Sequence, residues 1–328
     1  MTSVPSALHV NDAAFTAARI VHRAKHLGYA WELMPRAFRD PSWSGPVGEA
    51  RRALTGLAWA GRLAVEARSH DVVHIHSATT LRHTRPVVRR FVLHCHGSDV
   101  RSALYEPGRG PAIRAGLVDA EAVFYSTPDL AEHVLPHRPD AVLLPVPVDV
   151  DQLPGWRPDP TRPQVLFASR WEPVKGMQAQ LVTARLLVKA LGGSAEVIGL
   201  DWGPGATDAA AVGVRLVPRV THDEYVQMLA RATVVVGQAA GILSSSELEA
   251  LGCGAPLVVP GRLLATAGEP PPTHGHDPVS AVDAATQIIR DPGAHSPEPG
   301  RTWTRRHHGV DQAVATLADT YRRVVAAR

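Results

Sequence analysis

Short aliphatic runs alternate with segments of helical periodicity through the first half of the chain. The runs are rich in β-branched residues and bounded by turn residues, which is typical of buried strands. They predict strands at Ala7–Val10, Ala30–Met34, Asp71–His76, Arg90–His96, Ala122–Ser126 and Ala141–Pro145. Helices are predicted at Phe15–Leu27, Glu49–Ala67 and Ile113–Asp119, with one more helix start at Thr127, its N-cap. This alternation favours a parallel, doubly wound sheet.

The second half repeats the same architecture. Strands are predicted at Val165–Ser169, Glu196–Ile198, Val214–Leu216, Val234–Val236 and Pro256–Val259. Helices are predicted at Met177–Leu191, His222–Ala230, Ser246–Leu251, Val279–Asp291 and Val310–Val325. Residues 268–278 and the segment 291–300 are rich in proline and glycine and are interpreted as loops.

The domain boundary is predicted in the segment Pro145–Pro163, which holds six prolines and no periodicity. Residues 1–150 would form one Rossmann-like domain and residues 151–300 a second. Two parallel-sheet domains that face each other make a ligand cleft where their carboxyl-end loops meet. The predicted class is therefore α/β, and candidate site residues are sought at strand ends.

Composition narrows the class of protein. The 328 residues are 45% hydrophobic and 20% charged, which excludes a disordered or fibrous chain. Two cysteines are too few for a disulfide framework, and the net charge of +3 is too small to indicate a nucleic-acid partner. No signal peptide and no apolar run of about 18 residues is found, so a cytoplasmic location is expected. Nothing in the sequence indicates an oligomeric state.

Two cations follow the strand Val165–Ser169. Arg170 and Lys175 lie in a turn before the helix Met177–Leu191. Two cations at the mouth of a strand–turn–helix unit can hold a diphosphate, although spacing alone is equally compatible with solvated loop cations.

A second strand–loop–helix segment, residues 234–251, carries glycine, serine and two acids. Gly241 allows a ligand to approach the backbone closely. Ser244 and its neighbours form overlapping capping patterns with Glu247 and Glu249, and a helix N-terminus here could bind phosphate. At 100° per residue the two acids lie about 200° apart, so only Glu249 would face the same site as Ser245. A plain capped helix remains the alternative.

These segments resemble the donor-domain signature of family 4 glycosyltransferases. The resemblance rests on Arg170…Lys175-Gly176 and on Glu249-Ala-Leu-Gly-Cys-Gly-Ala-Pro-Leu-Val. Asp71-Val-Val-His-Ile-His, His96-Gly-Ser-Asp99 and Leu144-Pro-Val-Pro-Val-Asp149 are similar to further segments of that family. The resemblance covers nearly the whole chain and implies the GT-B fold, in which two Rossmann-like domains face a central cleft. It also implies that the C-terminal helix, within 301–328, returns to the N-terminal domain.

The resemblance implies a role for each matching residue. Arg170 and Lys175 would bind the donor diphosphate and stabilise the leaving nucleotide in place of a metal, and His96 would lie beside the donor sugar. The donor-binding residues would be Arg170, Lys175, Gly241, Ile242, Leu243, Ser244, Ser245 and Glu249, the last of them on the ribose hydroxyls. The acceptor side would include Asn11, Asp12, His76 and Asp99.

The implied activity is retaining, metal-independent transfer of a sugar from a nucleotide-diphosphate sugar, with no cofactor. A UDP-sugar is favoured over a GDP-sugar, and the acceptor would be a glycan, a lipid-linked molecule or a small molecule. Gly241 stands where the family usually has a glutamate that holds the donor sugar. Two alternatives therefore stay open: an inactive GT-B nucleotide-binding protein and a nucleotide-sugar epimerase.

Three other features admit sharper interpretations. His74 and His76 share one strand face, as do His94 and His96, but hydrogen-bonded sheet neighbours are favoured over a metal site. Cys95 is interpreted as a buried small hydrophobe. Arg82, Arg85, Arg89 and Arg90 form a basic segment, either a solvated surface or a weak peripheral membrane contact through the N-terminal domain.

Overall fold

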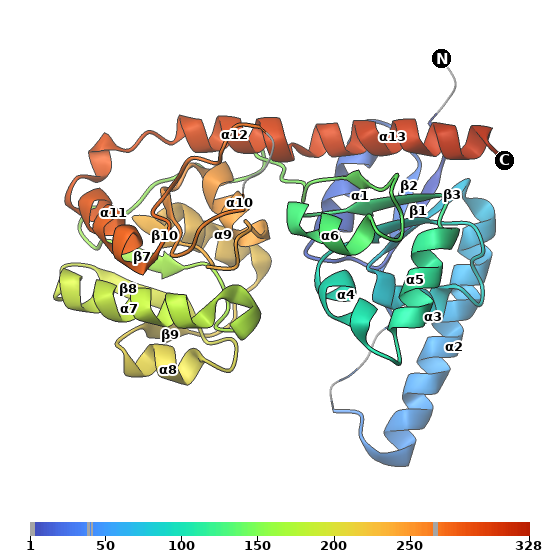
Figure 1. The fold of residues 1–328 in the computed structure, drawn as a ribbon, viewed down its shortest axis with the longest axis horizontal. Coiled ribbons are helices and arrows are strands. Elements are labelled where there is room, and N and C mark those ends of the chain that lie inside the picture. The colour runs from blue at the N-terminus through green and yellow to red at the C-terminus, as the bar shows by residue number, and fades with distance from the viewer. Residues whose placement is uncertain (1–3, 38–39, 41, 265–267) are drawn as a thin grey trace. The chain divides into compact units, whose positions relative to one another are not determined.

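The computed structural model describes residues 4–37, 40, 42–264 and 268–328. The chain divides into two compact units (Figure 1). The first unit comprises Met1–Pro147 and Val310–Arg328, and the second comprises Val148–Gly309. The predicted boundaries fell after residues 150 and 300, so residues 148–150 and 301–309 belong to the other unit from the one expected.

The first unit contains a six-stranded parallel sheet in the order β2-β1-β3-β4-β5-β6. Its strands are β1 (Ala7–Val10), β2 (Trp31–Met34), β3 (Val72–His76), β4 (Val92–Cys95), β5 (Ala122–Tyr125) and β6 (Val142–Leu143). The strand order reverses between β1 and β3, as in a doubly wound sheet.

Helices cover both faces of this sheet. On one face α1 (Thr16–His26) and α13 (Val310–Ala326) pack against β1, β3, β4 and β5. On the other face lie α2 (Gly45–Ser69), α3 (Leu81–Thr84) and α5 (Gly110–Asp119). Cys95 is fully buried on this second face, as predicted. The first unit therefore has a hydrophobic layer on each face of its sheet, and α13, from the C-terminal end of the chain, covers the layer on the α1 face.

The second unit contains another six-stranded parallel sheet, in the order β12-β11-β10-β7-β8-β9. Its strands are β7 (Gln164–Phe167), β8 (Glu196–Leu200), β9 (Arg215–Val217), β10 (Val234–Val236), β11 (Leu257–Val258) and β12 (Thr273–His274). The order reverses between β7 and β10, which pair directly. The predicted parallel, doubly wound architecture is confirmed in both units.

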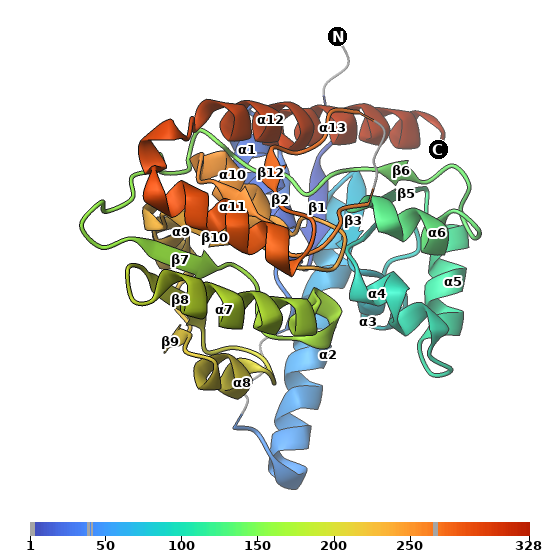
Figure 2. The ribbon, with the colours of Figure 1, turned by 60° about the vertical axis from the view of Figure 1, so that its left-hand side comes forward.

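Two groups of helices sandwich the second sheet. The helices α7 (Met177–Leu191) and α11 (Pro278–Arg290) lie side by side on one face, together with α8 (Ala206–Ala211) (Figure 2). At the other face α9 (His222–Arg231) and α12 (Glu298–His308) each pack on α10 (Ser245–Cys253).

Several short elements differ from the predictions. The strand β12 lies inside the predicted loop 268–278, and α12 begins within the predicted loop 291–300 because proline is tolerated in a first helical turn. Thr127 precedes a helical turn as predicted, but its side chain makes no capping bond there. The remaining short helices are α4 (Ser98–Arg101), α6 (Ala131–Val134), η1 (Ala78–Thr80), η2 (Ala103–Tyr105), η3 (Pro128–Leu130), η4 (Pro173–Lys175) and η5 (Pro292–Ala294). Among the described residues, no helix is both long and apolar enough to cross a bilayer.

Candidate functional site

The carboxyl edge of the second sheet brings the predicted donor residues together. The loops after β7 and β10 leave from adjacent strands at the point where the strand order reverses. In open α/β sheets this is where ligands bind. Arg170 and Lys175 come from the first loop, and residues 237–245 come from the second.

A backbone contact joins the two loops. The carbonyl oxygen of Lys175 accepts hydrogen bonds from the Ala239 N–H at 3.1 Å and from Gln180 Nε2 at 2.7 Å. Gly176 has a φ of 70°, and a Cβ at this position would lie 2.6 Å from the Ala239 Cβ. The close approach therefore requires glycine after Lys175, and it fixes where the lysine side chain begins.

Arg170 has an acidic neighbour in its own loop. Its Nε lies 2.8 Å from Glu172 Oε2. The guanidinium carbon is also 5.3 Å from the centre of the Trp202 ring, and Arg219 approaches the same ring at 4.2 Å. Cation–π attraction at these distances orders both arginines beside the carboxyl ends of β7, β8 and β9.

Glu247 organises the loop between β10 and α10 rather than facing a ligand. It is fully buried, and its Oε1 accepts from the Gln238 N–H at 2.8 Å. Its Oε2 accepts from the N–H of Ser244 at 2.7 Å and from the Ser244 hydroxyl. Of the overlapping capping patterns, the structure contains the one between Ser244 and Glu247.

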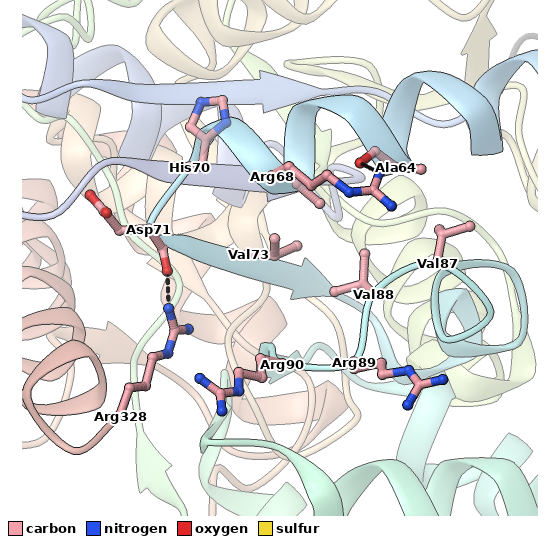
Figure 3. A pocket seen from close by; sticks show the side chains of 11 residues that line it. Ala64, Arg68, His70, Asp71, Val73, Val87, Val88, Arg89, Arg90 and Arg328 are labelled. Atoms are coloured by element: carbon pink, nitrogen blue, oxygen red, sulfur yellow. Dashed lines mark hydrogen bonds between the residues drawn. The ribbon is translucent and has the colours of Figure 1, made fainter.

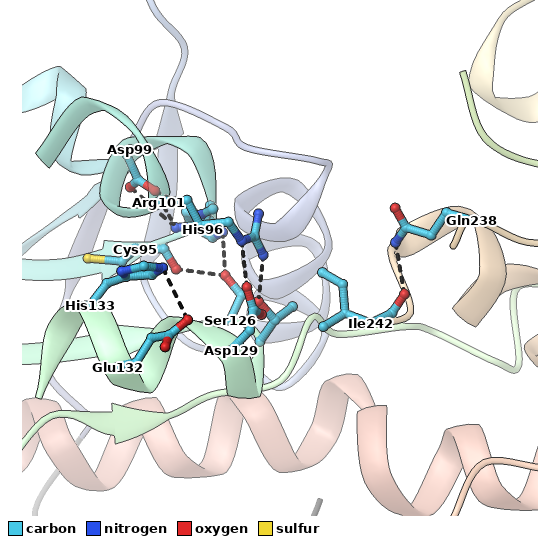
Figure 4. A network of polar contacts seen from close by, with 12 residues as sticks. Cys95, His96, Asp99, Arg101, Ser126, Asp129, Glu132, His133, Gln238 and Ile242 are labelled. Carbon is cyan, nitrogen blue, oxygen red and sulfur yellow. Dashed lines mark hydrogen bonds and ion pairs between the residues drawn. The ribbon is translucent and has the colours of Figure 1, made fainter. Parts of the chain in front are cut away.

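Gly241 gives this loop a backbone conformation that other residues rarely adopt. Its φ of 79° lies in the left-handed region, and its carbonyl accepts from the Leu264 N–H at 2.8 Å. The next carbonyl, that of Ile242, accepts from Gln238 Nε2 at 2.9 Å (Figure 4). The segment from Gly241 to Ser245 is thus held by its own polar contacts at the start of α10.

Glu249 is buried on the same helix and bonds to α9. Its Oε1 lies 2.7 Å from His222 Nε2. Nearby, Tyr225 donates its hydroxyl to the Ala168 carbonyl at 2.6 Å, which ties α9 to the end of β7. Burial raises the pKa of Tyr225, so this hydroxyl stays protonated.

In the first unit, three of the predicted acceptor-side residues hold the backbone. Asn11 Nδ2 donates to the His76 carbonyl at 2.7 Å, and Asp12 Oδ1 accepts from the Ala17 N–H at 3.0 Å. The buried Asp99 carboxylate accepts from backbone N–H groups of Ala78, His96 and Gly97. The described hydrogen bonds of Asn11, Asp12 and Asp99 therefore join these side chains to the backbone of the first unit.

Five imidazoles form a continuous histidine layer on the α13 face of the sheet. The histidine layer consists of His9, His74, His76, His94 and His96. All are fully buried except His96, which is half-buried. The sequence alone did not show that the two histidine pairs share one face, and His9 joins them there.

Both ring nitrogens of His96 have partners within the first unit, and Figure 4 shows the one from Ser126. Its Nε2 lies 3.0 Å from His76 Nδ1, and its Nδ1 lies 3.0 Å from Ser126 Oγ. Burial lowers the pKa of His96 to about 4, against an opposing effect of the Asp99 carboxylate. Burial also lowers the pKa of His9 to about 3 and that of His76 well below its usual value. The layer is neutral at pH 7.

Neutral imidazoles are also metal ligands, and two triads are close enough for one ion. In each triad the ring nitrogens lie within 4.8 Å of one another. The triads are His9, His74 and His76, and His76, His94 and His96.

The basic segment before β4 lines a separate hollow of about 220 Å³ at the amino ends of β3 and β4 (Figure 3). Arg89 and Arg90 line it with Arg68 and Arg328, over a floor of Val73, Val87 and Val88. Arg328 is paired with Glu121 at 2.8 Å. This hollow is at the opposite edge of the sheet from His96.

Comparison with known proteins identifies the architecture. No family model and no curated protein sequence matches the chain. Sucrose-phosphate synthase from Thermosynechococcus elongatus superposes with a TM-score of 0.68 at 14% identity, over 98% of this chain and 100% of that one. HepE from Anabaena, in complex with UDP and glucose, gives 0.66 at 13% identity over 96% and 99%. AviGT4, a glycosyltransferase involved in avilamycin A biosynthesis, gives 0.63 at 19% identity over 99% of both chains.

The chain has the GT-B fold. The predicted pair of parallel-sheet domains is confirmed, while membership of family 4 stays a prediction. The two loops that meet after β7 and β10 were predictable from the sequence. Glu172, Trp202 and His222 were not predicted as partners of these residues. Glu172 lies two residues from Arg170, and their pairing depends on the conformation of the turn. Trp202 and His222 contact Arg170 and Glu249 from segments far away in the chain.

Proposed function

We propose that the protein is a retaining, metal-independent glycosyltransferase that uses a nucleotide-diphosphate sugar. The supporting observation is the junction of two loops at the β7/β10 switch point, where the Lys175 carbonyl bonds to Ala239. This junction brings a cation, a glycine-containing backbone segment and the N-terminus of α10 to the carboxyl edge of the second sheet. Such an edge is a suitable environment for a diphosphate. The likeness to glycosyltransferase structures supports the same reaction class.

The proposed chemistry follows from charge. As the glycosidic bond breaks, negative charge develops on the leaving diphosphate, and Arg170 and Lys175 stabilise it as fixed cations. The acceptor hydroxyl attacks on the face that the nucleotide leaves and passes its proton to the departing diphosphate oxygen, so the anomeric configuration is retained. Glu249 accepts hydrogen bonds from the ribose, the backbone of Gly241–Ser245 contacts the sugar, and His96 lies beside it.

The proposed donor is a UDP-sugar. HepE, one of the similar structures, was solved with UDP and glucose. The acceptor is proposed to be a glycan, a lipid-linked molecule or a small molecule.

An inactive nucleotide-binding protein is the second candidate, and Gly241 favours it. Its φ of 79° builds a loop that has no side chain where the resembling family places a sugar-binding glutamate. An epimerase acting on a nucleotide sugar is a weaker third candidate.

Thermal unfolding with UDP, GDP, ADP and dTDP, each with and without EDTA, tests nucleotide binding. A ligand at a hundred times its Kd adds about 2.7 kcal/mol, which moves the Tm by several degrees. A shift with UDP that EDTA leaves unchanged supports the proposal, and donor hydrolysis or transfer then separates an enzyme from a binding protein. No shift with any nucleotide would contradict the diphosphate site.

We also propose a weak peripheral membrane contact through α2. This helix buries Leu63 toward the core, while Leu54 and Leu57 are about two-thirds exposed. At 100° per residue Leu54 lies about 180° and Leu57 about 120° from Leu63, and Arg51 lies about 60° from Leu54. An exposed apolar pair beside a cation is the feature from which this contact with anionic lipid is proposed.

Co-sedimentation with vesicles of anionic and neutral lipid tests this contact. Leu54→Ser combined with Leu57→Ser should remove binding to the anionic vesicles. The control is Val182→Ser, which changes an exposed apolar residue on α7 in the second unit. Equal sedimentation of the α2 variant and the control would exclude α2 as the contact.

A further inference from the structure

A chain of hydrogen bonds runs through the histidine layer from Tyr321 on α13 to Ser126, which follows β5. Tyr321 Oη lies 3.3 Å from His9 Nε2, and His9 Nδ1 lies 3.0 Å from His76 Nε2. His76 Nδ1 lies 3.0 Å from His96 Nε2, and His96 Nδ1 lies 3.0 Å from Ser126 Oγ. Each neutral imidazole in the chain has one donor and one acceptor nitrogen, so the direction of one bond determines the next.

Ser126 determines that direction. Its Oγ lies 2.7 Å from the carbonyl oxygen of Cys95, and two oxygens this close require a proton between them. The serine has only one proton and donates it to Cys95. Its Oγ can therefore only accept from His96, and His96 Nδ1 must carry the ring proton.

The remaining tautomers follow in order. His96 Nε2 is an acceptor, so His76 donates from Nδ1, and by the same reasoning His9 donates from Nδ1 to His76 Nε2. Tyr321 then donates to His9 Nε2, which uses its only proton. His74 Nδ1, at 2.5 Å from Tyr321 Oη, must donate to that oxygen.

We propose that Ser126, His76, His9 and Tyr321 are positioning residues that hold His96 as a neutral ring with its proton on Nδ1 and a fixed orientation. With both nitrogens engaged, His96 presents a rigid ring to the reaction rather than acting as a proton donor or acceptor. Head-to-tail bonds of this kind strengthen one another in a low-dielectric interior. The catalytic consequence rests on the proposed function, whereas the tautomers do not.

The first test measures the tautomers directly in the full-length protein. Long-range ¹H–¹⁵N correlation spectra of ¹⁵N-histidine-labelled protein distinguish Nδ1–H from Nε2–H rings. We expect His9, His74, His76 and His96 to be neutral Nδ1–H tautomers at pH 7. A proton on Nε2 of His96 or His76 would overturn the proposal, as would zinc in the purified protein bound to these rings.

The second test changes Ser126, the residue that determines the direction of the hydrogen-bond chain. Ser126→Ala removes the acceptor for His96 Nδ1–H, so we expect a mixture of tautomers at His96, His76 and His9, while Ser126→Thr keeps the wild-type pattern. Tyr321→Phe removes the other end, and Ser126 should still hold His96 and His76 as Nδ1–H rings. Unchanged tautomers in a folded Ser126→Ala variant would remove Ser126 from this role; if that variant does not fold, the wild-type spectrum remains decisive.

The third test links the chain to turnover. We expect Ser126→Ala to lower kcat about tenfold with little change in KM, because a misoriented ring acts on the reacting centre and not on donor affinity. An unchanged kcat would overturn the positioning role. A wild-type protein without turnover would contradict the proposed function and leave the tautomer result intact.

Discussion

One acid lies beside the proposed diphosphate clamp, and its charge opposes the charge of the ligand. Glu172 Oε2 is 2.8 Å from Arg170 Nε. We predict that Glu172→Gln lowers the Kd for a nucleoside diphosphate about three- to tenfold, since it removes a competing anion from a partly exposed arginine. Isothermal titration calorimetry measures the change.

The matched control is Glu196→Gln. Glu196 also pairs with an arginine, Arg215, but at the amino ends of β8 and β9, the opposite edge of the sheet. Its substitution should leave the Kd unchanged. Equal effects of the two variants would indicate a general charge effect rather than release of Arg170.

Lys175 is the residue on which the proposed reaction depends most. Lys175→Ala keeps the backbone contact to Ala239, so the fold should remain intact while donor turnover falls at least about a hundredfold. Turnover assays and circular dichroism measure the two effects. Lys189→Ala removes an exposed lysine from the same strand–helix unit and should leave turnover unchanged. Normal turnover in the Lys175 variant would exclude the clamp.

Single residues of the candidate site could be selected from the sequence where charge or glycine marked a strand end. Arg170 and Lys175 stand out in this way, whereas Glu249 was singled out by its place on the predicted helix. Their partners were not predictable, because the contacts of Glu249 with His222 and of Arg170 with Trp202 depend on how separate strands and helices pack. Short-range periodicity contains no information about such pairs.

At the scale of elements, the loop between β10 and α10 depends on the left-handed conformation of Gly241. A Cβ there would meet Leu264 only at an ordinary contact distance of 3.4 Å, so the cost of Gly241→Ala comes from φ alone. We predict a loss of about 1 kcal/mol in unfolding free energy. Gly241→Glu should have the same backbone cost, so a glutamate like that of family 4 glycosyltransferases should not fit this loop conformation without strain.

Gly56→Ala should change the unfolding free energy in the opposite direction from Gly241→Ala. Gly56 lies inside α2, and a Cβ there meets nothing within 4 Å. This substitution should stabilise the protein by about 0.5 to 1 kcal/mol. Urea unfolding measures both variants, and a stabilising Gly241→Ala would contradict the assigned loop conformation.

Elements were predictable where a run was long enough to show its period. The strand β1, the strand β10 and the helix α7 have the predicted bounds. The two-residue strand β12 and the proline-started helix α12 were missed, because the first is too short to alternate and the second begins with residues typical of loops.

At the scale of the whole molecule, the histidine layer makes stability depend on pH. Burial keeps the pKa of His9 at about 3 and of His96 at about 4, and holds those of His74, His76 and His94 well below the usual value. In the unfolded chain a histidine has a pKa of about 6.5. The unfolded state therefore binds more protons than the folded state between about pH 6.5 and pH 4.

Stability must then rise with pH across that window and be fully present above about pH 6.5. Each buried histidine makes the free energy of unfolding change by up to about 1.4 kcal/mol per pH unit. Five such residues can therefore remove, by about pH 5, much of the 5–15 kcal/mol that is typical for the unfolding of a protein domain. Urea midpoints at pH 8, 7, 6 and 5 measure the loss of stability, and hydrogen exchange of β1, β3 and β4 assigns it to the first unit.

His94→Leu changes a residue outside the Tyr321–Ser126 chain and should reduce the pH dependence of the unfolding free energy by about one proton. His26→Gln, on the exposed side of α1, should leave that pH dependence unchanged. A midpoint that stays constant from pH 8 to pH 5 would mean that these imidazoles are not held neutral in the folded protein.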